Sequence, residues 1–180
     1  MAKGFYTQKI TSGDKTQVTY SYNGYKSMTF TNTHSSAVSI TLYVTSQLGT
    51  DITDTTTDVN FTDGYSATTS SQAIVVDGTN ATDDVFLNEK VYLSSGKLIG
   101  TCTAVGGVTG ITFGSGLVNA LANNNSLYTG TRYTMLNAVE IPANTALQLH
   151  PEDFEFDTDS YNMYIDSNNA SGYIDIITRY

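Results

Sequence analysis

Short runs of alternating residues are the feature that most constrains the fold of this chain. The clearest is VSITLYVTS at residues 38–46, where aliphatic residues alternate with Ser, Thr and Tyr. Because successive side chains of a β-strand point to opposite faces, this run predicts a half-buried strand. Its core-facing residues would be Val38, Ile40, Leu42 and Val44. About ten short runs of this kind, separated by Gly, Asn, Ser and Thr, are expected to be strands.

The fold class follows from these runs. Only GLVNALANNN at residues 116–125 has helical spacing, so we expect at most one short helix. Many short strands and almost no helix favour an all-β fold, and specifically a β-sandwich or jelly-roll-like single domain with an inserted hairpin. A length of 180 residues is enough for one such domain with a sizeable core.

Turn residues predict three strand connections. Asn23-Gly24 between two alternating runs predicts a hairpin over residues 16–32, since a type I′ turn needs positive φ at both central residues. Residues 97–113 are typical of a second hairpin that bends at Gly106-Gly107. The stretch EIPANTALQLH at residues 140–150 predicts a strand, a tight turn at Pro142 and a further strand.

The pattern divides the chain into an N-terminal arm, residues 1–13, and a β-sandwich domain, residues 14–180. The arm is either a frayed terminus or a segment anchored on a neighbouring subunit by Phe5 and Tyr6. Within the domain we expect a long loop at 46–72 and an inserted hairpin region at 85–130. The candidate partner-contact residues are therefore Phe5, Tyr6, Phe61 and Tyr65.

The charge balance argues against nucleic acid as a partner. Asp and Glu number 17 against 8 Lys and Arg, which gives a net charge of −9 and a surface that repels phosphate backbones. No apolar run approaches the roughly 20 residues that a membrane span needs, and the N-terminus lacks an apolar leader segment. We expect a protein that is made in the cytoplasm and binds neither nucleic acid nor membrane.

Motifs for catalysis are few. The two histidines, His34 and His150, fall in predicted turns, and no G-x-S-x-G elbow is present to expose a nucleophile. Two histidines and the single Cys102 do not supply a zinc site, and SSGKL lacks the first glycine of a phosphate-binding loop. Cys102 is expected to be a small buried strand residue. The chain is therefore predicted to be non-enzymatic and to carry no cofactor.

One acidic segment, EDFEFDTDS at residues 152–160, could bind a cation. In an extended backbone Glu155, Asp157 and Asp159 would share one face, opposite Phe154 and Phe156. These carboxylates are a candidate calcium site, although no D-x-[DN]-x-[DN]-G pattern is matched. The alternative is a solvated acidic edge that discourages uncontrolled strand pairing.

Two segments carry a resemblance to a known class of proteins. YTMLNAVEIPANTALQLHPEDFEFDTDSYNMYIDSNNASGYIDIITRY, residues 133–180, resembles the C-terminal half of small structural proteins of tailed bacteriophages, especially those of marine cyanobacteria. MTFTNTHSSAVSITLYVTS, residues 28–46, looks like an earlier hairpin of the same proteins. On this resemblance, residues 98–130 would be an insertion between the two halves.

The resemblance implies a virion component and carries over no catalytic residue. We expect a capsid decoration, or cement, protein that binds neighbouring capsid subunits and is a homo-oligomer in the particle. The alternative is a neck, tail or fibre component that binds a receptor or glycan through exposed Tyr side chains. A hydrolase that uses the acidic segment as paired carboxylates is a further alternative.

Overall fold

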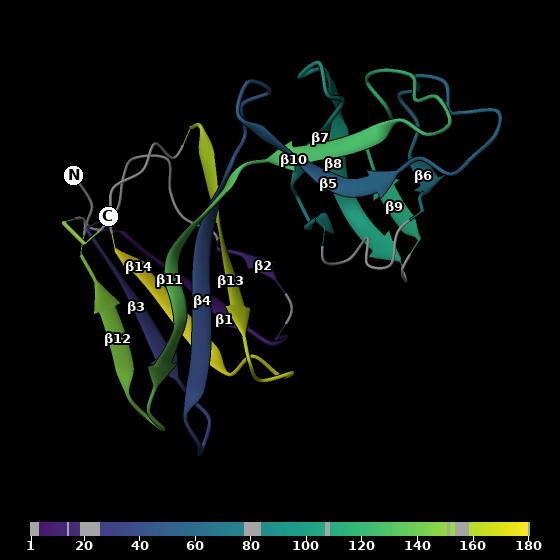
Figure 1. Cartoon of the computed structure of the whole chain (residues 1–180). Coiled ribbons are helices and arrows are strands. Elements are labelled where there is room, and N and C mark those ends of the chain that lie inside the picture. Colours follow the sequence, from purple (N-terminus) through teal and green to yellow (C-terminus); the bar gives the residue numbers. More distant parts are fainter. Residues whose placement is uncertain are drawn as a thin grey trace. The chain divides into compact units, whose positions relative to one another are not determined.

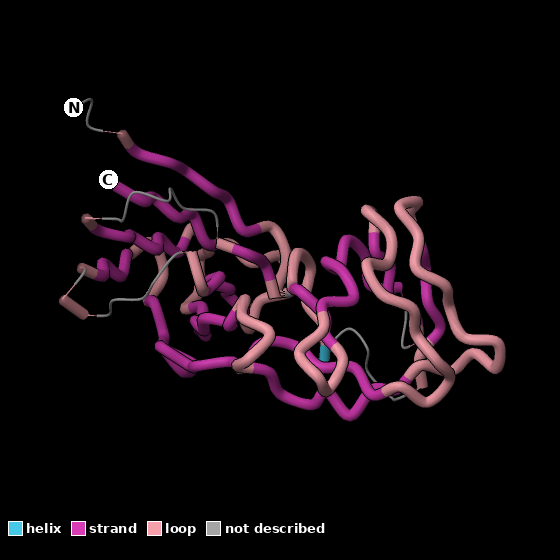
Figure 2. The backbone as a smooth tube through the Cα atoms, turned by 90° about the horizontal axis from the view of Figure 1, so that it is seen from above, coloured by secondary structure: helices cyan, strands magenta, loops and turns pink. Residues whose placement is uncertain are grey.

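The all-β, sandwich-like fold predicted from the sequence is confirmed. The computed structural model describes residues 4–13, 15–18, 26–77, 84–106, 109–150, 152–153 and 159–179. The described backbone consists of strands and loops, apart from the helical residue Asp84 (Figure 2). It forms two compact units, which we call the sandwich unit (Met1–Val44 with Arg132–Tyr180) and the inserted unit (Thr45–Thr131).

The sandwich unit contains two antiparallel four-stranded sheets, seen as two layers in Figure 1. The first has the order β1-β14-β3-β12 and the second the order β11-β4-β13-β2. The strands are β1 (Phe5–Ile10), β2 (Thr16–Gln17), β3 (Ser27–Asn32), β4 (Val38–Ser46), β11 (Arg132–Ile141), β12 (Ala146–Leu149), β13 (Tyr161–Ser167) and β14 (Ile174–Arg179).

The connectivity of this unit is that of a jelly roll. Strands from the first part of the chain pair with strands from the last part in reverse order: β1 with β14, β2 with β13, β3 with β12 and β4 with β11. Successive pairs belong alternately to the two sheets. This is a long antiparallel ribbon wrapped into a sandwich, and the inserted unit lies in the sequence between the strands of the innermost pair, β4 and β11.

The core of the sandwich unit lies between its sheets. Val38, Ile40, Leu42 and Val44 are all buried, as predicted from their alternation. The same periodicity places Ile174, Ile176 and Thr178 of β14 inward. The outward face of β14 therefore carries Asp175, Ile177 and Arg179.

The inserted unit has one six-stranded antiparallel sheet, in the order β5-β10-β7-β8-β9-β6. A bridge between Val59 and Val76 joins the chain just after β5 to the chain just after β6, so the outermost strands meet at one end and partly close the sheet. A separate apolar cluster that includes Phe113, Ile99 and Leu127 forms its core. The strands are β5 (Ile52–Asp58), β6 (Gln72–Val75), β7 (Lys90–Tyr92), β8 (Leu98–Gly106), β9 (Gly110–Phe113) and β10 (Ser126–Gly130).

The chain enters and leaves the inserted unit at adjacent positions. The backbone N–H of Ser46 donates to the carbonyl of Thr131 at 3.0 Å, and the N–H of Thr131 donates to Asp51 at 3.0 Å. Gly130 passes so close to Ser46 that a Cβ at Gly130 would overlap the Ser46 carbonyl oxygen. Because entry and exit are neighbours, a whole unit can be accommodated at this position without separating β4 from β11.

The predicted division of the chain is wrong in three places. Residues 5–10 of the predicted arm form β1, which pairs with β14 over its whole length and buries Ile10 in the core. The predicted loop at 46–72 contains the strand β5. The predicted insertion at 85–130 is part of a larger compact unit that begins at Thr45.

Two predicted connections also differ. The described strands within the predicted hairpin at 16–32, β2 and β3, do not pair with each other, because they belong to different sheets; the predicted turn, Asn23-Gly24, lies outside the described residues. The turn at Pro142 is present, with Asn144 at a φ of 56°, but the strands it joins also lie in different sheets. The turn at Pro142 is therefore as predicted, while the packing of two layers decided the partner strands in both cases.

The third predicted connection and the candidate helix have opposite outcomes. The predicted pairing within residues 97–113 is confirmed, since β8 and β9 are antiparallel neighbours. Residues 116–125 are all described and contain no helix. Leu117 and Leu121 instead make isolated bridges to Thr68 and Tyr65, which bury both leucines in the core of the inserted unit.

Substitutions in β1 test whether this segment is a structural strand. Ile10→Ala should lower the free energy of unfolding by about 2–4 kcal/mol, because Ile10 is buried between the sheets. Phe5→Ala should change it by less than about 1 kcal/mol, because the Phe5 ring is exposed. Urea unfolding followed by circular dichroism measures both, and equal effects of the two substitutions would show that β1 is not part of the core.

Two glycine substitutions test the close approach at Gly130. Gly130→Ala should cost about 2 kcal/mol or more, since its Cβ would meet the backbone of Ser46, which has no flexible end to move aside. Gly106→Ala is the matched control, because a Cβ there has no atom within 4 Å. Thermal unfolding should show a lower melting temperature for Gly130→Ala only. Equal melting temperatures would mean that the two backbones are not in close contact.

Candidate binding site

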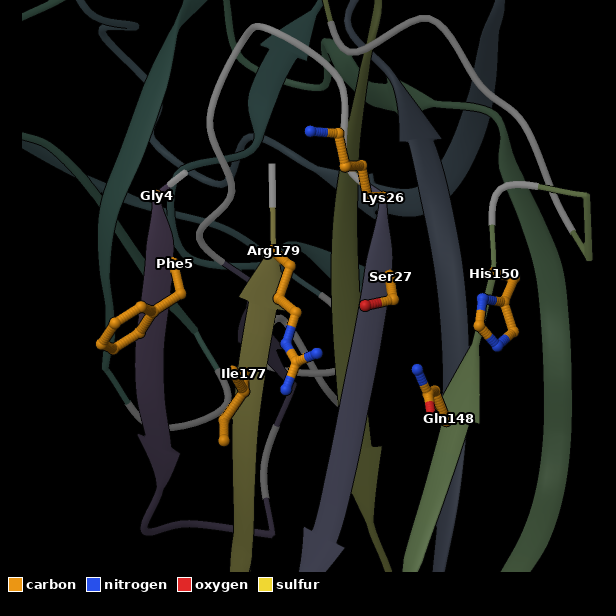
Figure 3. A pocket seen from close by; sticks show the side chains of 8 residues that line it. All are labelled: Gly4, Phe5, Lys26, Ser27, Gln148, His150, Ile177 and Arg179. Atoms are coloured by element: carbon orange, nitrogen blue, oxygen red, sulfur yellow. The ribbon is translucent and has the colours of Figure 1, made fainter. Parts of the chain in front are cut away.

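A pocket of about 670 Å³ lies in the sandwich unit, on the outer face of the sheet β1-β14-β3-β12 (Figure 3). All four strands of the sheet, with the residues that adjoin them, contribute to it. A volume of this size is typical of sites for small organic ligands. The lining residues are Gly4, Phe5, Lys26, Ser27, Gln148, His150, Ile177 and Arg179.

The sheet register brings these residues together. Arg179 lies opposite Phe5 on one side and opposite Ser27 on the other, so the three form one row across β1, β14 and β3. Ile177 and Gln148 both lie opposite Thr29 in a second row, two residues further along. Both rows face outward, because the residues between them in sequence point into the core.

The electrostatic character of the pocket is opposite to that of the chain. Lys26 and Arg179 are two of only eight Lys and Arg residues, and neither Asp nor Glu is among the lining residues within the described part of the chain. The guanidinium of Arg179 extends from β14 toward β3, and the amide of Gln148 lies on the far side of β3 (Figure 3). Planar guanidinium groups bind carboxylates and phosphates through two parallel hydrogen bonds, so the pocket is suited to an anionic ligand.

The comparisons with known proteins add no relative. No family model, curated protein or solved structure matches this chain. The described residues include no helix with the length and hydropathy of a membrane span. The function must therefore be argued from the residues of this chain.

One lining residue of this pocket, Phe5, is among the residues predicted to contact a partner protein, which stays a prediction. Its side chain is 71% exposed at the pocket wall. Tyr6 lies opposite Thr178 and is 40% exposed. Lys26 and Arg179 were not predicted, since they lie at opposite ends of the chain. The sequence signal that could have identified Arg179 is the alternation of residues 174–179, because it places Arg179 on the same face as Asp175 and Ile177, opposite Ile174 and Ile176.

The other predicted contact pair, Phe61 and Tyr65, belongs to the inserted unit. Their rings stack with centroids 4.9 Å apart, and the Tyr65 hydroxyl accepts a hydrogen bond of 2.8 Å from the N–H of Val75. Tyr65 also packs against the core, whereas Phe61 is 42% exposed. The exposed Phe61 ring is therefore supported by a tyrosine that packs against the core.

The candidate calcium site cannot be assembled from described residues. Glu155 and Asp157 lie outside the described part of the chain, and Asp159 is exposed. Within the described residues, no group of three His, Cys, Asp or Glu side chains is arranged to hold a metal ion.

The two histidines have different environments. His34 is held in a turn, where its N–H donates to Asn32 Oδ1 at 2.8 Å and its Nδ1 accepts from the N–H of Ser36 at 3.2 Å. Its ring also packs on Tyr173, with centroids 4.5 Å apart. His150 lines the pocket, where its ring can hydrogen-bond to a ligand.

Cys102 is a buried strand residue, as predicted. It is fully buried in β8, and its thiol donates a weak hydrogen bond of 3.6 Å to the carbonyl of Ala104. Burial raises the pKa of the thiol to about 11, and the nearby carboxylate of Glu89 adds to the shift. Burial and the same carboxylate raise the pKa of Tyr92 to about 12, and the Tyr92 hydroxyl donates to the carbonyl of Gln47 at 2.7 Å. Both groups therefore stay protonated at neutral pH.

The raised thiol pKa predicts how Cys102 responds to alkylation. Since the thiolate is the nucleophile, native protein at pH 8 should react with iodoacetamide far more slowly than unfolded protein, and its rate should rise toward pH 11. The control is the same reaction in guanidinium chloride, where the thiol has its ordinary pKa. Equal native and unfolded rates would show that the thiol is accessible and ionised.

Proposed function

We propose that this chain is a non-enzymatic structural protein of a bacteriophage virion. In this role it is a decoration protein of the head, which binds neighbouring capsid subunits and further copies of itself and so stabilises the shell. The proposal combines the resemblance of residues 28–46 and 133–180 with the jelly-roll connectivity, an architecture used by viral capsid proteins and also by lectins.

The observation that carries the proposal is the exposure of aromatic side chains on an outermost strand. β1 is at the edge of its sheet, and it displays Phe5 and Tyr6 to solvent. An edge strand offers backbone hydrogen-bonding groups to a neighbouring subunit, and aromatic side chains are the commonest anchors in protein interfaces. Phe61 gives the inserted unit an exposed aromatic of its own.

The surface charge is consistent with assembly from solution. A net charge of −9 keeps separate copies soluble through mutual repulsion until a partner surface binds them. Many weak contacts, repeated over a shell, then add up through multivalency. The site of action in this proposal is the assembled virion.

A second candidate function is favoured by the pocket. A neck, tail or fibre component that binds a receptor or glycan would need a concave site with polar and apolar walls, and the sandwich unit has such a site. The copy number in the particle distinguishes the two roles.

The experiment that tests the proposal is quantitative mass spectrometry of purified phage particles, with this chain counted against the major capsid subunit. A ratio near one, or one copy per capsomer, supports head decoration. A handful of copies per particle supports the neck, tail or fibre role. The absence of the chain from the particle contradicts both virion roles.

Substitution of the exposed aromatics tests the proposed contacts. Phe5→Ser and Phe61→Ser should each reduce incorporation into particles by about tenfold, because loss of an aromatic anchor weakens an interface by more than about 1 kcal/mol. Val118→Ser is the matched control, since Val118 is an exposed apolar residue outside the predicted contacts. Copies per particle are counted as above, and undiminished incorporation of both Phe variants would rule these residues out as anchors.

A further inference from the structure

We propose that the pocket on the sheet β1-β14-β3-β12 binds a carboxylate-bearing sugar residue, such as a uronic acid, with Arg179 as the ligand of the carboxylate. This inference rests on the second candidate function, glycan binding, and does not require the decoration role.

The positively charged lining residues favour a ligand that carries a carboxylate. Arg179 and Lys26 supply two cations, and the lining residues that the structure describes include neither Asp nor Glu, within a chain that has about twice as many acids as bases. A ligand carboxylate that enters the pocket therefore meets the attractive groups of the site instead of the prevailing negative charge of the surface. The guanidinium can accept it in a bidentate geometry, which Lys26 cannot provide.

The remaining lining residues match the rest of a sugar ring. Ser27, Gln148 and His150 carry side chains that can donate or accept hydrogen bonds, as hydroxyl groups require. Phe5 and Ile177 offer apolar surface, on which the C–H face of a pyranose ring can pack. A small inorganic anion would need only the two cations, so it would leave these polar and apolar groups unused.

The geometry of the sheet makes the site pre-formed. Arg179 is held between β1 and β3 by the register that pairs it with Phe5 and Ser27. The N–H of Lys26 donates to the carbonyl of Arg179 at 2.7 Å, which ties the two cationic residues together through the backbone. A sheet positions side chains more precisely than a loop, so little ordering entropy is lost when the ligand binds.

The test is a titration of the full chain with methyl β-glucuronide, followed by the amide signals in two-dimensional NMR spectra. Methyl β-glucoside is the matched neutral sugar, which differs only at the carboxylate. We expect the glucuronide to shift signals of the pocket residues at millimolar concentration and to bind at least about tenfold more tightly than the glucoside. Arg179→Gln should abolish this preference, and Lys26→Gln should weaken it.

Lys97→Gln is the matched control variant, because Lys97 is exposed on the inserted unit and its loss changes the net charge equally. It should bind the glucuronide like the unmodified chain. Each variant is first checked for a native spectrum, and if Arg179→Gln does not fold, the Lys26→Gln titration decides.

Three further outcomes would overturn the proposal. Equal binding of acetate and glucuronide would mean an anion site without sugar recognition. Tighter binding of a tetraglutamate peptide would mean a site for acidic protein segments, and no binding of the glucuronide would mean that the pocket does not bind uronic acids. None of these outcomes depends on the copy number in the virion, so failure here is distinguishable from failure of the decoration role.

Discussion

The pairing of the first strands of the chain with the last is the constraint on which the rest of the structure depends. β1 pairs with β14 from Phe5 opposite Arg179 to Ile10 opposite Ile174, so the outermost pair of the ribbon joins segments near the two ends of the sequence. Every inner pair of the sandwich unit then follows in reverse order. Contacts of such long range carry a large loop-closure entropy, which the buried faces of both sheets must offset together.

The candidate site is a direct consequence of this pairing. Phe5, Ser27 and Arg179 form one row only because β14 lies between β1 and β3. The inward-facing residues of the same strands form the core, while outward-facing residues line the pocket. The integrity of the pocket and the stability of the fold therefore depend on the same strand pair. A change that separates β1 from β14 would remove Phe5 from the pocket wall and would also expose Ile10 of the core.

The inserted unit shows how a jelly roll can accommodate a second compact unit within its chain. Its chain leaves and returns at Ser46 and Thr131, which are hydrogen-bonded neighbours next to the innermost strand pair. The unit has its own apolar core, and a bridge from Val59 to Val76 partly closes its sheet, which limits the exposed strand edge. In the proposed decoration role, this unit and the edge strand β1 would each supply a contact surface.

The sequence by itself determined the all-β class, the buried residues Val38, Ile40, Leu42 and Val44 of β4 and the burial of Cys102, because a period of two specifies which side of a strand is apolar. It did not determine the partner of each strand. Pro142 correctly signals a turn, yet the strands on either side of it belong to different sheets, as do the strands β2 and β3 on either side of Asn23-Gly24. Backbone hydrogen bonds are the same for every partner, so only the packing of two layers around one core could make that choice. For the same reason Phe5–Ile10 was mistaken for an arm, and Lys26 and Arg179 could not be recognised as one site before the fold brought them together.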